Sequence, residues 1–373
     1  MTYNWQRQDW PNFRYDLGGL HETLFAFAEK VGHASGTLKG VSDSSRSETI
    51  LNLMIEEAVN TSAIEGEYLN RSDVKSSMLN HMGLNKPQAA VHDKRARGIG
   101  ELMLDVRNNF AGALSESTLF SWHRMLMQGN SNRHLIIGDW RKGEDAMQVV
   151  SGPIGKHKIH FEAPPSVRVP QEMKRFIDWF NATAPGGSAE IKLAPVRSAI
   201  AHLYFESIHP FDDGNGRIGR AISAKALSQG LGRPVLLSLS KAIEAKKNLY
   251  YNALEKTQKS NEITAWVKYF IETVLAAQID AEALINFILA KAQFFDRYEQ
   301  QMSDRQLKAI RRMLENGPQA FEGGMNARKY SAITGASKAT ATRDLQALSE
   351  MGVLVPIGEG RSRRYEINIS SAT

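Results

Sequence analysis

The 373-residue sequence contains no cysteine. Disulfide bonds, thiolate zinc sites, iron–sulfur clusters and cysteine nucleophiles are therefore excluded. There is no uninterrupted run of 18 or more apolar residues, so we expect no membrane-spanning helix. The first eleven residues lack the apolar stretch of a secretory signal peptide. These absences predict a cytoplasmic protein that does not act at a membrane.

Hydrophobic residues make up 42% of the chain and charged residues 23%, as in ordinary globular proteins. The length predicts two or three domains. The net charge is +6, and residues 303–373 hold 11 basic and 7 acidic side chains, so most of the excess lies at the C-terminal end. A nucleic acid is the natural anionic partner of such a segment, although a merely solvated tail explains the charge equally well.

Apolar residues recur at spacings of three and four in several segments, which is the pattern of amphipathic helices. These segments are 48–64, 172–183, 195–207, 249–254 and 263–279. Strand patterns are rare before residue 350. The best candidate is a hairpin with strands at 149–150 and 158–161 and a turn at 152–155.

The C-terminal segment has a different order of elements. We expect helices over 303–314, 327–333 and 337–351, followed by strands at 353–356 and 361–367. Three helices followed by a hairpin is the order of a winged helix.

The stretch from His209 to Arg220 holds the densest group of functional residues. Gly214 and Gly216 allow successive backbone N–H groups to point toward one place, and the helix that opens after them adds its unpaired N–H groups and the positive end of its dipole. Such a turn binds anions, phosphates above all.

Three kinds of side chain complete this arrangement. Arg217 and Arg220 lie three residues apart on one face of the first helical turns and can each hold phosphate oxygens. Asp213 is a hard carboxylate suited to Mg²⁺. His209 can accept a proton near neutral pH.

Residues 214–219 also match the G-x-G-x-x-G pattern of dinucleotide-binding folds. That pattern requires a preceding strand and an acidic residue about 20 positions later. Here a helix precedes the glycines, and the nearest acidic residue, Glu244, lies late and in a helical pattern. We therefore reject this interpretation.

His209–Arg220 matches every fixed position of the HPFx[DE]GNGRxxR signature, and the chain thereby resembles the Fic family, whose members typically transfer AMP from ATP to a protein hydroxyl. Residues 138–141, 149–165 and 250–254 also look like core features of that family. The aromatic-rich start resembles the N-terminal region of a large bacterial subgroup.

The resemblance implies that His209 takes the proton from a Ser, Thr or Tyr hydroxyl of a target protein, and that Asp213 holds Mg²⁺. It implies ATP contacts from Glu65, Ile159, His160, Phe161, Glu162, Gly214, Asn215, Gly216, Arg217, Ile218, Gly219, Arg220, Tyr250 and Gln258. Residues 149–165 would be the flap that aligns the target by strand addition. A plain surface hairpin, and core packing of Tyr250 and Gln258, are the alternatives.

Residues 61–66 fit the [ST]xxxE[GN] pattern of the Fic inhibitory helix. In this interpretation Glu65 pairs with Arg220, which would otherwise grip the γ-phosphate. A surface glutamate beside a helix-ending glycine is the alternative.

We therefore expect a mainly α protein, with a helical Fic core, a small β-hairpin flap and a C-terminal winged helix-turn-helix domain. The expected segments are an N-terminal helical region with the inhibitory helix (1–85), the catalytic core (86–280), a linker helix (281–302) and the winged helix (303–373). The expected activity is autoinhibited protein adenylylation with ATP and Mg²⁺.

The alternative function is that of a DNA-binding regulator with a sensory or inactive Fic core. Residues 337–345 resemble a recognition helix, and Arg361, Arg363 and Arg364 lie in the expected wing. A winged helix serves protein contacts or dimerisation equally well, and the family suggests a homodimer.

Overall fold

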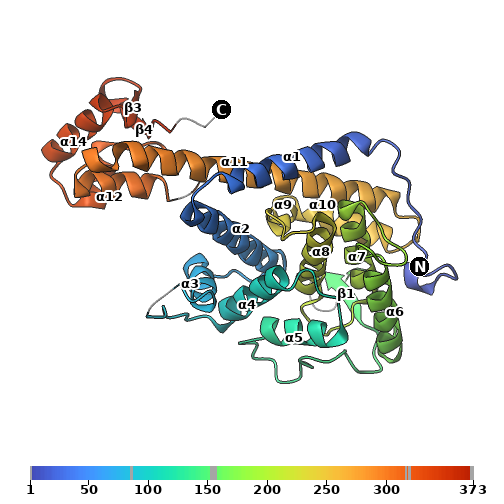
Figure 1. The fold of residues 1–373 in the computed structure, drawn as a ribbon. Helices are drawn as coiled ribbons and strands as arrows, with labels where there is room; N and C mark the ends of the chain where they lie inside the picture. The colour runs from blue at the N-terminus through green and yellow to red at the C-terminus, as the bar shows by residue number, and fades with distance from the viewer. Residues whose placement is uncertain (1, 85–86, 152–157, 316, 318–320, 370–373) are drawn as a thin grey trace. The chain divides into compact units, whose positions relative to one another are not determined.

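The computed structural model describes residues 2–84, 87–151, 158–315, 317 and 321–369. The fold is mainly helical, as predicted (Figure 1). The α-helices are α1 (His21–Lys39), α2 (Asp43–Ile64), α3 (Arg71–His81), α4 (Lys94–Asn108), α5 (Glu116–Leu126), α6 (Val169–Ala182), α7 (Ala194–Ile208), α8 (Asn215–Leu231), α9 (Leu239–Glu244), α10 (Lys247–Thr257), α11 (Thr264–Tyr298), α12 (Asp304–Met313), α13 (Ala327–Thr334) and α14 (Lys338–Glu350).

The chain forms two compact units. The first comprises Met1–Gly32 and Ile50–Ile279, and the second comprises His33–Thr49 and Asp280–Thr373. The boundary near residue 280 falls inside the continuous helix α11, so no separate linker helix divides the units there.

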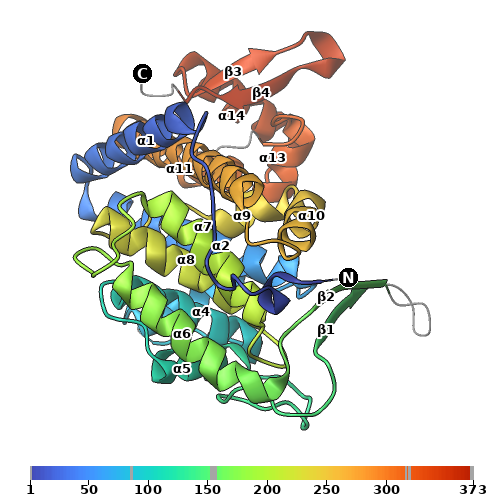
Figure 2. The same cartoon turned by 90° about the vertical axis from the view of Figure 1, so that its right-hand side faces the viewer.

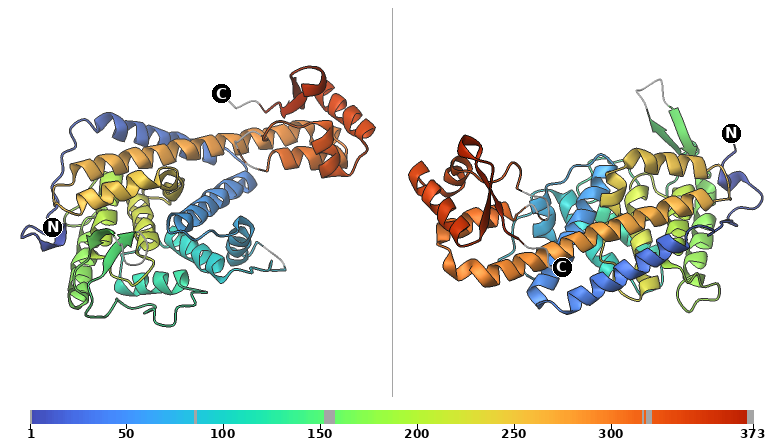
Figure 3. Two further views of the ribbon diagram at one scale, coloured as in Figure 1. Left: turned by 180° about the vertical axis from the view of Figure 1, so that it is seen from behind. Right: turned by 90° about the horizontal axis from the view of Figure 1, so that it is seen from above.

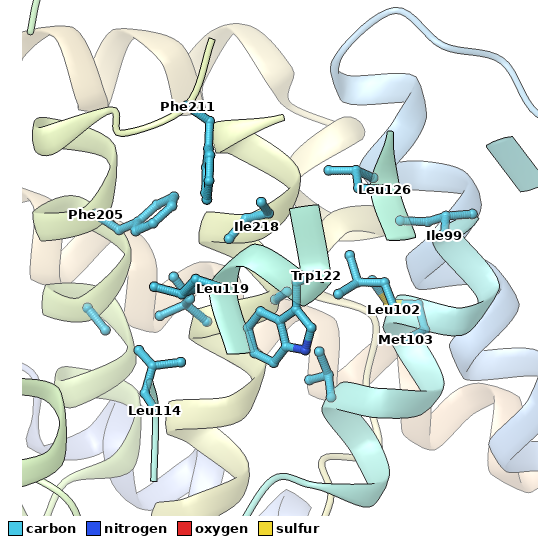
Figure 4. Packing of buried hydrophobic residues seen from close by; sticks show 14 of the residues in the cluster. Ile99, Leu102, Met103, Leu114, Leu119, Trp122, Leu126, Phe205, Phe211 and Ile218 are labelled. Atoms are coloured by element: carbon cyan, nitrogen blue, oxygen red, sulfur yellow. The ribbon is translucent and has the colours of Figure 1, made fainter. Parts of the chain in front are cut away.

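Helix α7 is the central element of the first unit, since all of its residues are buried. It packs extensively against α8, which follows it after a six-residue loop. Phe211 in that loop and Ile218 in α8 are fully buried and point into a cluster around Trp122 of α5 (Figure 4). Hydrophobic packing of Phe211 therefore holds the loop that carries the predicted site against the core.

Two strands of the first unit form an antiparallel hairpin, β1 (Gln148–Ser151) and β2 (Lys158–Glu162), with a bulge between Val149 and Val150 (Figure 2). They lie where the sequence pattern predicts them, and the expected turn at 152–155 lies outside the described residues. Trp5 donates from Nε1 to the Glu162 carbonyl at 2.7 Å, so the N-terminal segment fixes the base of the hairpin.

Helix α11 is longer than the predicted 263–279 segment (Figure 3). Residues 264–301 are long and apolar enough, by length and composition, to cross a membrane. The exclusion drawn from the sequence was therefore too strong, because it required an uninterrupted apolar run. Burial offers another reason for this composition, since Trp266, Val267 and Phe270 lie in the core of the first unit.

The second unit has a hydrophobic cluster of its own, which includes Met313, Tyr330 and Leu345. Helices α12, α13 and α14 are followed by an antiparallel pair, β3 (Leu354–Ile357) and β4 (Arg364–Ile367). The order is the predicted one of three helices and then two strands.

Candidate active site

His209 directly follows α7 and has left-handed backbone angles, φ 51° and ψ 60°. It is the only non-glycine residue with a positive φ in the described part of the chain. This uncommon conformation is held by Arg141, which donates from Nε to the His209 carbonyl at 2.7 Å and from its backbone N–H to the Pro210 carbonyl at 2.9 Å. The chain therefore reverses direction sharply at His209, where α7 ends.

The His209 ring is neutral at pH 7. Burial lowers its pKa to about 4, and the positive charge of Arg141 acts in the same direction. A neutral imidazole has one nitrogen free to accept a proton, as a general base must.

The loop after His209 is braced by two side chains. Asn215 accepts from the Phe211 N–H at 2.9 Å and donates to the Phe211 carbonyl at 2.8 Å. His123 stacks on the Phe211 ring, with 4.1 Å between ring centroids. It accepts at Nδ1 from the Gly138 N–H (2.9 Å), which leaves Nε2 to donate to the Asp213 carbonyl (3.2 Å). His123, which sequence reasoning missed, is thus a structural brace.

The first turn of α8 presents unpaired N–H groups. Gly214 precedes it with φ 84°, which favours glycine, and supplies no side-chain cap. The first amide of the helix ladder is that of Ile218, which bonds to the Gly214 carbonyl. The N–H groups of Asn215, Gly216 and Arg217 make no hydrogen bond to any residue that the structure describes. The turn therefore has three free N–H donors, which is what the predicted anion-binding turn requires.

The carboxylate of Glu65 lies against this turn. A Cβ added at Gly216 would collide with Glu65 Oε1. Glu65 also accepts from Arg220 Nη2 at 2.7 Å. Burial alone would raise the pKa of Glu65, but Arg220, with help from Arg217 and Lys247, brings it below its ordinary value. The Glu65 carboxylate thus already lies beside Gly216, in the anion-binding turn.

Arg220 is fully buried and turned toward the end of α2. It donates from Nε to Thr61 Oγ1 at 2.7 Å and from Nη2 to the Thr61 carbonyl at 2.9 Å. Its Nη1 is buried and has no partner among the described residues. Burial, the largest influence, would lower the Arg220 pKa, but the charge and hydrogen bond of Glu65 together with Tyr250 and Glu206 raise it, so the guanidinium stays charged.

Arg217 has an acidic partner of its own that sequence reasoning missed. Its Nη1 donates to Glu67 Oε2 at 2.7 Å, and its Nη2 lies 3.4 Å from Asp213 Oδ1. Its Nε is buried without a partner in the described structure. Both arginines of α8 are therefore paired with glutamates that follow α2, and both have N–H capacity left over.

Asp213 fits the predicted Mg²⁺ role. Its side chain is half-exposed beside the anion-binding turn, which leaves carboxylate oxygen free for a cation. Within the described residues no cluster of three or more metal-ligating side chains exists. A Mg²⁺ ion here would take its other ligands from water and substrate phosphates, which is common for this ion.

The hairpin residues have different surroundings. Ile159 is exposed, whereas Phe161 is buried with its edge toward Tyr3. His160 lies between the hairpin and α10, with Nδ1 2.6 Å from Glu255 Oε2 and Nε2 2.6 Å from Ser151 Oγ. The hydrogen bond from His160 is the largest influence on the Glu255 carboxyl and lowers its pKa to about 2, although burial acts in the opposite direction. Glu162, the last of the four hairpin residues predicted to contact ATP, accepts a hydrogen bond from Gln148 Nε2 at 3.0 Å.

Four other predicted ATP contacts lie in the protein interior. Tyr250 is buried with its hydroxyl 2.8 Å from His202 Nε2, and Gln258 donates to the Glu206 carbonyl at 3.3 Å. Ile218 is in the hydrophobic cluster. Gly219 faces α7, where an added Cβ would collide with Glu206 Oε1. These four residues therefore make their contacts within the protein interior.

Comparison with known proteins matches two regions of the chain. Residues 113–227 match the Fic/DOC family, and residues 3–84 match a "Domain of unknown function (DUF4172)". A probable protein adenylyltransferase of Aquifex aeolicus is 29% identical over 119 residues, which are 30% of this chain. That match spans only 35% of the relative's length.

Two solved structures share the fold. A Fic family protein from Desulfovibrio desulfuricans aligns over 96% of this chain and 98% of its own, with a TM-score of 0.52 and 19% identity. A Fic domain containing signaling protein from Bacteroides thetaiotaomicron aligns over 70% and 95%, with a TM-score of 0.52 and 16% identity. The loop between α7 and α8, with the site built on it, lies within residues 113–227, the region that matches the Fic/DOC family.

Proposed function

We propose that this chain transfers AMP from ATP to a Ser, Thr or Tyr hydroxyl of a target protein and of itself. One observation carries the proposal. The first turn of α8 has three free N–H groups, and the carboxylate of Glu65, paired with Arg220, already lies against Gly216, where a phosphate would bind. The charge of the same carboxylate acts on the neutral His209. The Fic/DOC domain and the name of the Aquifex relative agree with this activity.

In the proposed reaction His209 takes the proton of the target hydroxyl. The hydroxyl oxygen then forms a bond to the α-phosphorus of ATP, and the bond between that phosphorus and the bridging oxygen of the β-phosphate breaks, so pyrophosphate leaves. The chain supplies position and positive charge, which are the main requirements of such a transfer. Arg217 and Arg220 would hold the β- and γ-phosphates, and Asp213 would hold Mg²⁺, which neutralises phosphate charge when bound.

We further propose that the two glutamates after α2 hold this site in check. Glu65 and Glu67 each bind one arginine that ATP would need. ATP that binds with Glu65 in place would have its γ-phosphate displaced and its α-phosphate turned away from attack. Releasing the glutamates would free the guanidiniums.

The test is intact-mass spectrometry of the full chain incubated with ATP and Mg²⁺. We expect Glu65→Gly to gain one AMP mass at least about tenfold faster than the wild type, because tenfold corresponds to an interaction of only about 1.4 kcal/mol. Glu67→Gln should give a smaller increase, and adding His209→Ala to Glu65→Gly should abolish transfer. Absence of AMP on Glu65→Gly and on any offered protein would refute the activity, whereas equal rates for wild type and Glu65→Gly would refute only the inhibition.

A second candidate function belongs to the C-terminal unit. Helices α12–α14 with β3 and β4 have the order of a winged helix, and α14 is capped by the exposed Ser337, begins at the exposed Lys338 and carries the exposed Arg343. We propose that α14 binds DNA, as a recognition helix does.

A further inference from the structure

Glu206 of α7 is a buried carboxyl group that the proposed reaction does not use. Its side chain is 8% exposed, and its Oε1 has no hydrogen-bond partner among the described residues. A buried carboxyl without a partner costs free energy, so its presence requires an explanation. Its neighbours suggest one.

The carboxyl lies on the Nδ1 side of the His209 ring. Glu206 Oε2 is 3.8 Å from His209 Nδ1, which is too long for a direct hydrogen bond but is spanned by a small side-chain movement. His202 lies one turn before Glu206 on α7, with its Nε2 bonded to Tyr250 and its Nδ1 buried without a partner among the described residues, on the Oε1 side of the carboxyl. Oε2 is the oxygen that faces His209. Gly219 of α8 faces Glu206, and any side chain there would displace the carboxyl.

The charges around Glu206 come from several elements. Glu65, which follows α2, and Arg220, from α8, act on it in opposite directions. The other titratable groups around it are His202, His209, Tyr250 and Tyr251. Arg141 faces His209 from the other side. Burial and the charge of Glu65 raise the pKa of Glu206 to about 8. Removing Glu65 would therefore make Glu206 ionise at lower pH.

We propose that Glu206 is a positioning residue for His209: its carboxyl faces Nδ1–H, which keeps Nε2 free to take the proton of the target hydroxyl. The inference rests on the proposed function. When the proton moves from the hydroxyl to Nε2, the ring becomes an imidazolium, and an ionised Glu206 stabilises that charge. The same logic applies to other histidine bases that a carboxylate orients.

The test compares Glu206→Gln with the unaltered residue in the Glu65→Gly background. We expect the kcat for AMP transfer in Glu65→Gly to rise about tenfold with pH as Glu206 ionises, below pH 8. In the double variant this rise disappears, while the KM for ATP changes less than twofold. Glu272→Gln, which removes an exposed glutamate of α11, is the matched control. Coincident pH profiles for Glu65→Gly and the double variant would overturn the inference.

A measurement without activity separates this inference from the proposed function. ¹⁵N NMR of the full chain, with His209→Ala to assign the ring, reports which nitrogen carries the proton. Above pH 8, where Glu206 is ionised, we expect the Nδ1–H form to dominate in the wild type and to lose population in Glu206→Gln; an unchanged population there would overturn the role of Glu206. If Glu65→Gly transfers no AMP, the proposed function fails, and the NMR result still decides whether Glu206 orients His209.

Discussion

The anion-binding turn depends on the absence of a side chain at Gly216. An added Cβ would collide with Glu65 Oε1, so it would stand in the space that a phosphate must use. We expect Gly216→Ala in the Glu65→Gly background to weaken ATP binding at least about tenfold, measured by calorimetry with the full chain. Gly32→Ala on α1, where an added Cβ meets nothing within 4 Å, is the control. Unchanged ATP affinity would mean that phosphate does not bind over Gly216.

Part of the candidate site could be predicted from the sequence alone. His209, Asp213, Arg217 and Arg220 lie within twelve residues, so local spacing alone predicts their common site. Glu65 required a separate short pattern, and the structure does place it 2.7 Å from Arg220.

Three supporting residues could not be predicted in this way. Glu67 is 150 positions from Arg217, and Arg141 is 68 positions from His209. Glu206 is close in sequence, but an acidic residue on a helix is usually exposed, and only its burial distinguishes it. Contacts of this kind depend on how the helices pack.

At the scale of elements, the hairpin β1–β2 is attached to α10 by a few polar contacts. His160 bonds to Glu255, and Lys158 lies 3.5 Å from the same carboxylate. We expect Glu255→Gln to loosen the hairpin, so that amide exchange at 158–162 becomes faster and transfer to a target protein falls several-fold, while ATP affinity is unchanged. Hydrogen exchange and the AMP-transfer assay in the Glu65→Gly background measure the two effects.

Lys259→Gln is the matched control for the hairpin, because it removes another polar partner of Glu255, just after the end of α10, and leaves His160 in place. If Glu255→Gln changed neither exchange nor transfer, the hairpin would not be held by this contact.

Some helix boundaries could be predicted from the sequence patterns and others could not. Helix α8 begins at Asn215 because Gly214, with φ 84°, ends the preceding turn there, a local signal that the sequence displays. Helix α11 runs 19 residues beyond the predicted end at 279. Its buried apolar residues continue past residue 279 at Ala281, Ile285 and Ile288, so the helical pattern itself persists beyond the predicted end.

At the scale of the whole chain, the two units have separate hydrophobic clusters, one around Trp122 and the other around Leu345. A substitution on the surface of one unit should therefore leave the packing of the other intact. This separation allows the two proposed functions to be tested independently in the full chain.

The DNA proposal predicts that the double substitution Lys338→Ala with Arg343→Ala weakens DNA binding about tenfold or more at 100 mM salt. Both side chains are exposed on α14, and losing two phosphate contacts should also reduce the slope of log affinity against log salt by about 2. Fluorescence anisotropy with a labelled duplex measures both. Lys308→Ala on α12, an exposed lysine on another helix, should have a smaller effect. AMP transfer should be equal in all of these variants when each also carries Glu65→Gly. Equal DNA binding by wild type and double variant would remove α14 as the contact surface, and no binding even at low salt would leave protein contacts as the role of this unit.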